Sequence, residues 1–186
     1  MIPIQQITGR LGNQMFQYAF LHNYSIEHDI DHYVQDPKYF KENNDEIVAI
    51  FQEGVLAKPI DMVAIHVRRG DYTTTHSHFY VDLFENGYYQ RAMDEFPNKE
   101  FLVFSDDIEW CKKQDIFKDC EFYHGTEIED MNMMASCVGH IIANSSFSWW
   151  GAYISPYTER VVAPKVENWY KDGFERTICP PSWLRV

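Results

Sequence analysis

The chain has 186 residues, of which 45% are hydrophobic and 16% aromatic, and this apolar content suffices for the packed core of one domain or of two small ones. Its formal net charge of −12 at pH 7 argues against the broad basic face that nucleic-acid binding needs. Any anionic substrate must therefore be held by a few local cations, and we expect no nucleic-acid partner.

The N-terminal segment and the cysteine spacing indicate the expected cellular compartment. No basic region followed by an apolar stretch opens the sequence, and no run of about 18 apolar residues occurs. The four cysteines lack C-x-x-C spacing, which favours reduced structural thiols over a disulfide or a zinc site. We therefore expect a cytoplasmic protein with at most peripheral membrane association. Its oligomeric state stays open.

The first predicted elements are a short strand at residues 2–7 and a glycine turn at residues 9–12. The turn leads into a helix from about Asn13 to Asn23, because apolar side chains recur there at helical spacing. Gly12 and Asn13 would let the backbone approach a ligand, although Asn13 also suits a simple helix cap. A polar stretch without clear periodicity follows at residues 26–36.

The most informative segment is a strand predicted at residues 63–67 and the turn after it. Alternation along the strand puts His66 and Arg68 on one side. The adjacent guanidinium groups of Arg68 and Arg69 are costly to hold together unless an anion lies over them, and their planar forks suit phosphate oxygens. The pattern fits a diphosphate clamp, or else a surface pair that closes on Asp71 and other acids.

Strands and helices then alternate. We expect helices at residues 82–96, 106–114, 128–138 and 146–154, and strands at residues 101–104, 120–123, 140–143 and 160–163. This alternation predicts an α/β fold with a parallel sheet, right-handed crossovers and helices on both faces. We interpret residues 61–186 as one Rossmann-like domain and residues 1–60 as a reduced N-terminal region. Ligands of such sheets bind outside the carboxyl ends of the strands.

One polar cluster, Ser105, Asp106 and Asp107, follows the strand predicted at residues 101–104. Its serine and acids suit a helix N-cap with first-turn carboxylates, which would need no ligand. A carboxylate at this position can also accept both N–H groups of a guanine edge. The two interpretations are compatible, since one aspartate can cap the helix while the other binds.

A second polar cluster follows the strand predicted at residues 140–143 and consists of Asn144, Ser145, Ser146 and Ser148. Its hydroxyls and the free backbone N–H groups of a helix N-terminus would suit phosphate oxygens. The alternative is a plain helix cap, followed by two tryptophans that pack into the core.

Together the glycine turn, the His66 segment and the two clusters resemble the inverting α-1,2-fucosyltransferases, which use GDP-fucose. These motifs occur in the family's order, and the match covers the chain to about Leu21 and from about Tyr33 onward. The resemblance implies a GT-B-type glycosyltransferase that moves L-fucose from GDP-β-L-fucose to a galactoside hydroxyl in α-1,2 linkage. It implies inversion, no metal and no cofactor beyond the donor. The partners would be GDP-fucose and a galactose-containing glycan.

The resemblance also implies residue roles. Arg68 would contact the β-phosphate, with His66 beside it donating to phosphate or fixing the donor, and an acid of the Asp106 cluster would select the base. Arg69 would join the clamp or brace the loop, because its side chain should point to the opposite face. Asp71 would orient an arginine or take the acceptor proton. Nearby guanidinium groups lower the pKa of Asp71, which favours the orienting role and leaves the catalytic base unassigned.

The chain departs from the family between Asn23 and Tyr33, where it is too short to build the usual acceptor-side subdomain. This departure leaves a non-catalytic GDP-sugar-binding module as the alternative to an enzyme. A third possibility is a metal-dependent transferase that uses Asp29 and Asp31. These two acids follow no clear strand, and a solvated loop explains them better.

Overall fold

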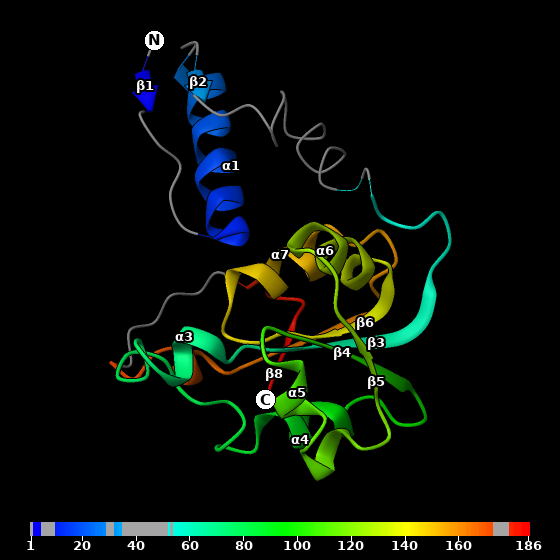
Figure 1. Cartoon of the computed structure of the whole chain (residues 1–186). Helices are drawn as coiled ribbons and strands as arrows, with labels where there is room; N and C mark the ends of the chain where they lie inside the picture. The colour runs from blue at the N-terminus through cyan, green and yellow to red at the C-terminus, as the bar shows by residue number, and fades with distance from the viewer. Residues whose placement is uncertain (1, 5–9, 29–31, 35–51, 53, 173–178) are drawn as a thin grey trace.

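The structure is a computed structural model that describes residues 2–4, 10–28, 32–34, 52, 54–172 and 179–186. In this part of the chain six strands form one parallel sheet: β3 (Ile60–Val67), β4 (Glu100–Ser105), β5 (Glu121–Tyr123), β6 (Cys137–Ile141), β7 (Arg160–Ala163) and β8 (Leu184–Arg185). Their spatial order is β5-β4-β3-β6-β7-β8 (Figure 1). A separate parallel pair consists of β1 (Ile2–Ile4) and β2 (His32–Val34).

Helices cover both faces of the six-stranded sheet. They are α1 (Leu11–His28), α3 (Gly70–Thr73), α4 (Tyr88–Asp94), α5 (Ile108–Cys111), α6 (Glu127–Ala135) and α7 (Ser146–Tyr153), with 3₁₀ turns at Asp115–Phe117 and Val166–Asn168. Helices α4 and α5 lie on one side of the sheet, whereas α6 and α7 lie on the other (Figure 1). The expected α/β fold with a parallel sheet is therefore confirmed. Among the helices that the structure describes, none has the length and apolar character to span a bilayer.

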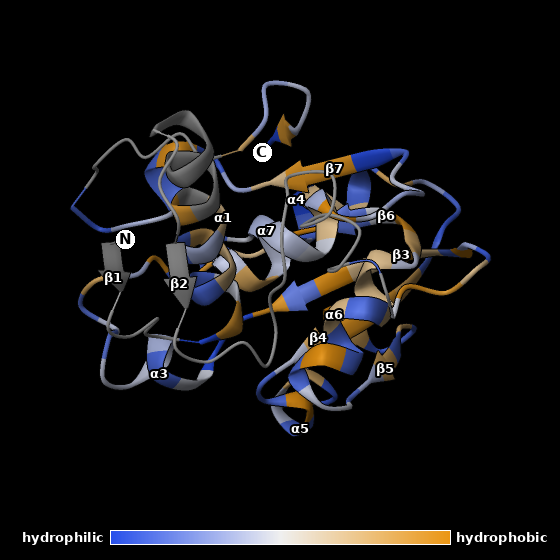
Figure 2. Ribbon diagram, turned by 90° about the horizontal axis from the view of Figure 1, so that it is seen from above, coloured by the Kyte–Doolittle hydropathy of each residue, from blue (hydrophilic) through white to orange (hydrophobic). Residues whose placement is uncertain are grey.

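The central strand β3 is buried on both faces, which is why it is an almost continuous apolar run. Val63 and Ile65 pack in a cluster with Tyr88 of α4, while Ala64 packs in another with Met134 of α6. Figure 2 shows the same apolar character along most of β7. Because side chains alternate, His66 lies on the α6 side with Ala64.

Helix α1 joins the layer formed by α6 and α7. Its Met15 and Tyr18 are buried in one cluster with Trp149 and Trp150 of α7. The ring of Phe16 lies 4.7 Å from that of Trp149, measured between centroids. Both tryptophans are thus core residues, as predicted, and they anchor α1 beside the first turn of α7.

Several predicted boundaries are wrong. The helix predicted at residues 82–96 is confined to α4, because the Asp82 side chain accepts from the amides of Phe84 and Glu85 in a turn and Gly87 has a positive φ of 74°. Likewise α5 replaces a longer helix predicted at residues 106–114. The helix predicted at residues 128–138 ends at Ala135, since the buried residues after it pair with β3 as strand β6.

Two further differences lie near the chain ends. Helix α1 continues to His28, into the stretch predicted to lack periodic structure. The sequence prediction also missed β8, whose two residues pair with β7. Asp29 and Asp31, the acids of the metal-dependent alternative, lie outside the described residues.

The strand order predicts a crevice at the carboxyl ends of β3 and β6. From β3 the chain proceeds to β4 and β5 on one side, and from β6 to β7 and β8 on the other. The connections therefore diverge between β3 and β6, and the segments after these two strands leave a gap at their carboxyl ends. Arg68 follows β3 and Asn144 follows β6 within a few residues, so both predicted motifs border this gap.

Candidate active site

A cavity of about 730 Å³ opens at the carboxyl ends of β3, β4 and β6, beside the first turn of α1. Its size is within the usual range for small-molecule sites. Ten of the predicted site residues line it: Gly12, Asn13, His66, Arg68, Asp71, Ser105, Asp106, Asn144, Ser145 and Ser146. Three others, Arg69, Asp107 and Ser148, do not. The fold thus brings together residues that are up to 134 positions apart in sequence, from Gly12 to Ser146.

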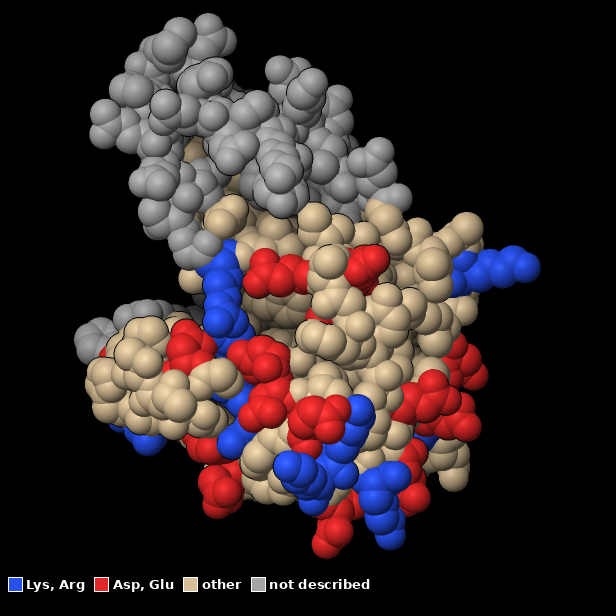
Figure 3. Space-filling view, viewed as in Figure 1, with Lys and Arg blue, Asp and Glu red and all other residues tan. Residues whose placement is uncertain are grey.

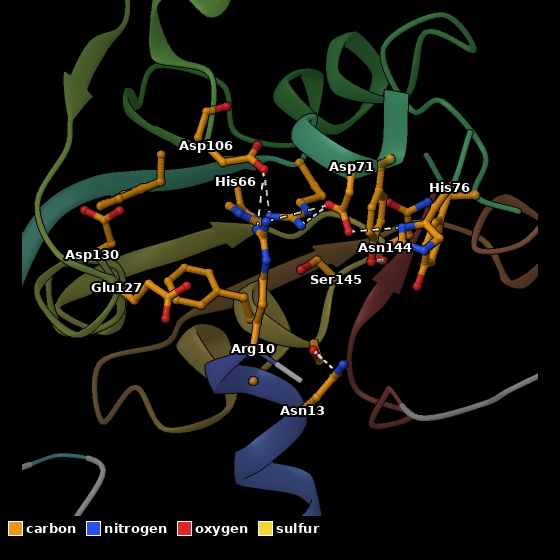
Figure 4. A pocket seen from close by; sticks show the side chains of 18 of the residues that line it. Arg10, Asn13, His66, Asp71, His76, Asp106, Glu127, Asp130, Asn144 and Ser145 are labelled. Carbon is orange, nitrogen blue, oxygen red and sulfur yellow. Dashed lines mark hydrogen bonds and ion pairs between the residues drawn. The ribbon is translucent and has the colours of Figure 1, made fainter. Parts of the chain in front are cut away.

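Arg68 is the centre of the cavity's charge arrangement. Its side chain is 9% exposed, and its two terminal nitrogens hold different carboxylates. Nη2 donates to Asp71, and Nη1 lies 2.7 Å from Oδ2 of Asp106 (Figure 4). The guanidinium carbon also lies 5.0 Å from the ring centroid of Tyr72, within the range of a cation–π contact. Arg68 is therefore held rigidly in the cavity wall.

Asp71 is ionised in this arrangement. Burial acts to raise the pKa of its carboxyl group, but the charges of Arg68 and Arg10 and a hydrogen bond with His76 outweigh burial, so the pKa lies below the ordinary value. The Nδ1 atom of His76 is 3.2 Å from Oδ2 of Asp71. A carboxylate with a lowered pKa is a weak base, which favours the predicted orienting role.

Arg69 points away from the cavity, to the opposite face from Arg68. Its guanidinium carbon lies 3.4 Å from the ring centroid of Trp110, and its Nε lies 3.6 Å from the carboxylate of Asp107. Asp107 is the N-cap of α5, since its Oδ1 accepts from the backbone amide of Trp110 at 3.2 Å. The geometry therefore favours loop bracing over the diphosphate clamp for Arg69, and helix capping over base selection for Asp107.

Asp106 instead faces the cavity and ties the turn after β3 to the end of β4. Its Oδ1 accepts from the backbone amide of Arg69 at 2.9 Å. Gly70 has a φ of +26°, and a Cβ atom there would lie 2.4 Å from Oδ2 of Asp106. Only glycine fits such a backbone conformation and such a close approach. The hydroxyl of Ser105 accepts from the amide of Asp107 at 3.0 Å, which completes the turn.

His66 is a buried neutral imidazole. Burial, and secondly the charge of Arg68, lower its pKa to about 3. Its Nδ1 has no hydrogen-bond partner among the described residues, and its ring lies 5.4 Å from that of Phe147. The hydroxyl of Tyr89 donates to its backbone carbonyl at 3.1 Å and fixes the strand end. The imidazole ring itself lines the cavity, whereas its unpartnered Nδ1 is enclosed by protein atoms.

Two helix N-termini meet at the cavity. Ser145 is the N-cap of α7 in extended conformation, and its side chain makes no capping bond. The hydroxyl of Ser146 donates to Oδ1 of Asn13 at 2.7 Å, which links α7 to the start of α1. The first N–H groups of a helix lack intrahelical partners and attract anions. This edge of the cavity is therefore favourable for phosphate oxygens.

Asn144 and Ser148 have structural roles. The Asn144 amide nitrogen donates to the carbonyls of Val81 and Trp169, at 3.0 and 3.1 Å, and so holds two loops against the end of β6. The buried hydroxyl of Ser148 accepts from the amide of Ala143 at 3.1 Å and donates to the carbonyl of Ser145. Neither side chain is therefore free to bond a phosphate in this arrangement.

Sequence reasoning missed several residues that line the cavity. An aromatic wall comes from α3, from the loop after it and from the C-terminal part. Tyr72 and Tyr80 are stacked at a centroid distance of 3.5 Å, with Tyr170 beside them. The acids Glu127 and Asp130 come from α6. Burial raises the pKa of Asp130, whose carboxylate accepts from the Gly125 amide at 2.7 Å.

Charges of both signs are mixed around the site. The face in Figure 3 carries acidic side chains interspersed with basic ones. Within the described ranges, no group of three or more His, Cys, Asp and Glu side chains has the geometry to hold a metal ion. Arg10 and Arg68 are the arginines that line the cavity, and the helix N-termini add partial positive charge.

Comparison with known proteins relates this chain to glycosyltransferases. The profile of glycosyl transferase family 11 matches residues 19–186. An alpha-1,2-colitosyltransferase of Escherichia coli is 35% identical over 176 residues, which cover 82% of this chain and 60% of the relative. The O-antigen biosynthesis glycosyltransferase WbnK of Escherichia coli is 27% identical, over 91% of this chain and 65% of its own length.

A more distant relative is the galactoside 2-alpha-L-fucosyltransferase Sec1 of Mus musculus, which is 28% identical over 53% of this chain and 30% of its own length. The chain thus spans 60–65% of the two bacterial relatives and a smaller share of the mouse protein. The predicted resemblance to α-1,2-fucosyltransferases is confirmed by the family match.

Proposed function

Because this chain belongs to glycosyl transferase family 11, we propose that it transfers L-fucose from GDP-β-L-fucose to a galactoside hydroxyl, in α-1,2 linkage and with inversion. One observation carries the proposal beyond family membership. Arg68 and two helix N-termini converge on a cavity at the carboxyl ends of a parallel sheet, where nucleotides bind in related folds.

The fold supports a nucleotide-sugar site of the Rossmann-like type. Counted from β3, the strand order is 3-2-1-4-5-6, the order of doubly wound dinucleotide-binding sheets. We assign residues 61–186 to this GDP-sugar-binding domain and residues 1–60 to a reduced N-terminal region of a GT-B-type enzyme. The packing of α1 against α7 brings that N-terminal region to the donor cavity.

In the proposed reaction the acceptor oxygen forms a bond to the anomeric carbon of fucose while the bond from that carbon to the β-phosphate oxygen breaks. The leaving GDP gains negative charge, and the acceptor hydroxyl loses its proton to a base that we leave unassigned. Arg68 and the N-terminus of α7 stabilise the charge on the diphosphate, so no metal is required. The neutral imidazole of His66 lines the same cavity and adds one polar contact to the donor.

The aromatic wall supports an acceptor site beside the donor. Tyr80 and Tyr170 line the same cavity as Arg68. Aromatic rings pack well against the C–H faces of sugars, and their hydroxyls can pair with sugar hydroxyls. We therefore assign the galactoside to the side of the cavity formed by the loop after α3.

A non-catalytic GDP-sugar-binding module is the second candidate, because the chain between Asn23 and Tyr33 is too short for the usual acceptor-side subdomain. Both candidates share the donor site. Only the enzyme also positions an acceptor, and loss of that positioning lowers rates by about 100-fold or more.

Calorimetry with GDP, GDP-fucose, GDP-mannose and UDP, run with and without a chelator, tests the donor site. Binding of GDP and GDP-fucose in chelator is expected, and a requirement for magnesium or manganese would contradict the metal-independent mechanism. Turnover with a panel of galactosides then separates the enzyme from the module. The turnover assay also includes a colitosyl donor, because the 35% identical relative is named for colitosyl transfer. Donor binding without any transfer would favour the module.

A further inference from the structure

Arg10 lies at the edge of the cavity, immediately before α1, on an element far in sequence from Arg68. Its backbone carbonyl accepts from the amides of Asn13 and Gln14, at 3.0 and 3.1 Å, so the start of the helix fixes its main chain. A Cβ atom on Gly12 would lie 2.6 Å from backbone atoms of α7, which shows how closely the first turns of α1 and α7 approach. The main chain of Arg10 is thus fixed beside the N-terminus of α7, at the edge of the cavity that is favourable for phosphate oxygens.

Arg10 and Arg68 are directed at the same two oxygen atoms. Nη1 of Arg10 is 3.7 Å from Oδ2 of Asp106, the oxygen that Arg68 holds at 2.7 Å. Nη2 of Arg10 is 4.0 Å from Oδ1 of Asp71, which Arg68 also contacts. Figure 4 shows Arg10 reaching from α1 towards these two acids. Two guanidinium groups therefore share two carboxylates, and the positive and negative charges of the cluster balance.

The two arginines differ in how firmly they are held. Arg68 is 9% exposed and bonds both acids at close range, whereas the Arg10 side chain is 57% exposed and contacts them only beyond hydrogen-bond distance. Long ion pairs between exposed groups contribute little to stability. An anionic ligand would therefore release Arg10 from the acids more readily than it would release Arg68.

We propose that Arg10 is a diphosphate-binding residue, which exchanges Asp71 and Asp106 for the phosphate oxygens of the nucleotide sugar. Arg68 stays bonded to its two acids in the cavity wall, and Arg10 together with the N-terminus of α7 holds the diphosphate. Its planar fork can bond two phosphate oxygens at once. The N-terminal segment thereby contributes directly to donor affinity. This inference rests on the proposed GDP-sugar site.

The test measures binding of GDP, GMP and guanosine by calorimetry to the 186-residue chain and to the variant Arg10→Gln. Loss of a charge-assisted bidentate contact is expected to weaken GDP by about 10- to 100-fold, GMP by less, and guanosine not at all. The matched control is Arg160→Gln. Arg160 is 52% exposed, pairs with Glu95 at 3.4 Å and lies at the amino end of β7, away from the cavity, so this control should leave all three affinities unchanged.

Unchanged GDP affinity in Arg10→Gln, or an equal loss for guanosine, would overturn the inference. Arg10→Lys keeps the positive charge and should retain part of the GDP preference over guanosine, so it decides the question if the glutamine variant folds poorly. Failure of the unsubstituted chain to bind GDP would contradict the proposed function itself. Normal GDP binding that is indifferent to Arg10 would contradict this inference alone.

Discussion

Gly12 and Phe147 are in such close contact that a Cβ atom on Gly12 would lie 2.6 Å from the backbone nitrogen of Phe147. The two residues belong to the first turns of α1 and α7, and both turns border the cavity. Real Cβ atoms do not approach backbone that closely, and backbone cannot swing aside as a side chain can. The absence of a side chain at Gly12 therefore sets the position of α1, and of Arg10 before it, relative to the donor site.

We expect Gly12→Ala to destabilise the protein. The alanine gains at most about 1 kcal/mol of helix propensity. Forcing a methyl group against fixed backbone costs about 1–3 kcal/mol, so a net loss of stability follows. Thermal and urea unfolding measure it. The control is Gly54→Ala, where the obstacle is the movable side chain of Asn132. Equal stability of the two variants would contradict the packing argument.

Arg68→Lys should weaken GDP binding by about tenfold or more, because one ammonium cannot hold Asp71 and Asp106 in the places that the guanidinium fork sets. Transfer activity should fall at least as far. Calorimetry and turnover measure both effects, with Arg160→Lys as the control for a general arginine replacement. A near-normal rate in folded Arg68→Lys would return this arginine to a purely structural role.

The two neighbouring aspartates should respond differently to substitution. Asp107→Ala removes the cap of α5 and should cost about 1 kcal/mol of stability without changing the preference for GDP over UDP. Asp106 faces the cavity. If Asp106 selects guanine, Asp106→Asn should reduce the preference for GDP over UDP. Calorimetry with both nucleotides decides. Equal loss for GDP and UDP at Asp106 would exclude the guanine contact and direct attention to Asp130, another acid in the cavity.

Acid should destabilise the protein through its buried histidines. Burial lowers the pKa of both His66 and His140 to about 3, whereas in the unfolded chain both have the ordinary histidine pKa of 6.5. Their contribution to stability is therefore complete above pH 6.5 and is lost as the pH falls. Each histidine should reduce the free energy of unfolding by about 2 kcal/mol between pH 7 and pH 5.

Urea denaturation at pH 7, 6 and 5 measures this dependence. His140 lies away from the cavity, and His140→Gln removes one titrating group. This variant should take up about one proton fewer on unfolding, so its free energy of unfolding should depend less steeply on pH. A free energy of unfolding that stays constant from pH 7 to pH 5 would contradict the neutral, buried state of these imidazoles.

The sequence by itself determined the features that depend on local periodicity and on chain order. Alternating strands and helices predicted the parallel sheet, and the two-residue repeat predicted that His66 and Arg68 share a face while Arg69 points away. Polar clusters directly after apolar strands predicted where ligands would bind, because parallel strands end at a common edge. Ten of the proposed site residues accordingly line one cavity.

Only the tertiary structure decided which neighbour does which task. Asp106 and Asp107 are equivalent in sequence pattern. Asp107 makes a local cap bond to Trp110, whereas the partner of Asp106, Arg68, is brought to it by packing. The short extents of α4 and α5 depend on turns held by side chains, which periodicity does not register. Arg10 reaches the acids of Arg68 because α1 packs on α7. Such contacts between residues far apart in sequence follow from how side chains fill space, and no local pattern encodes them.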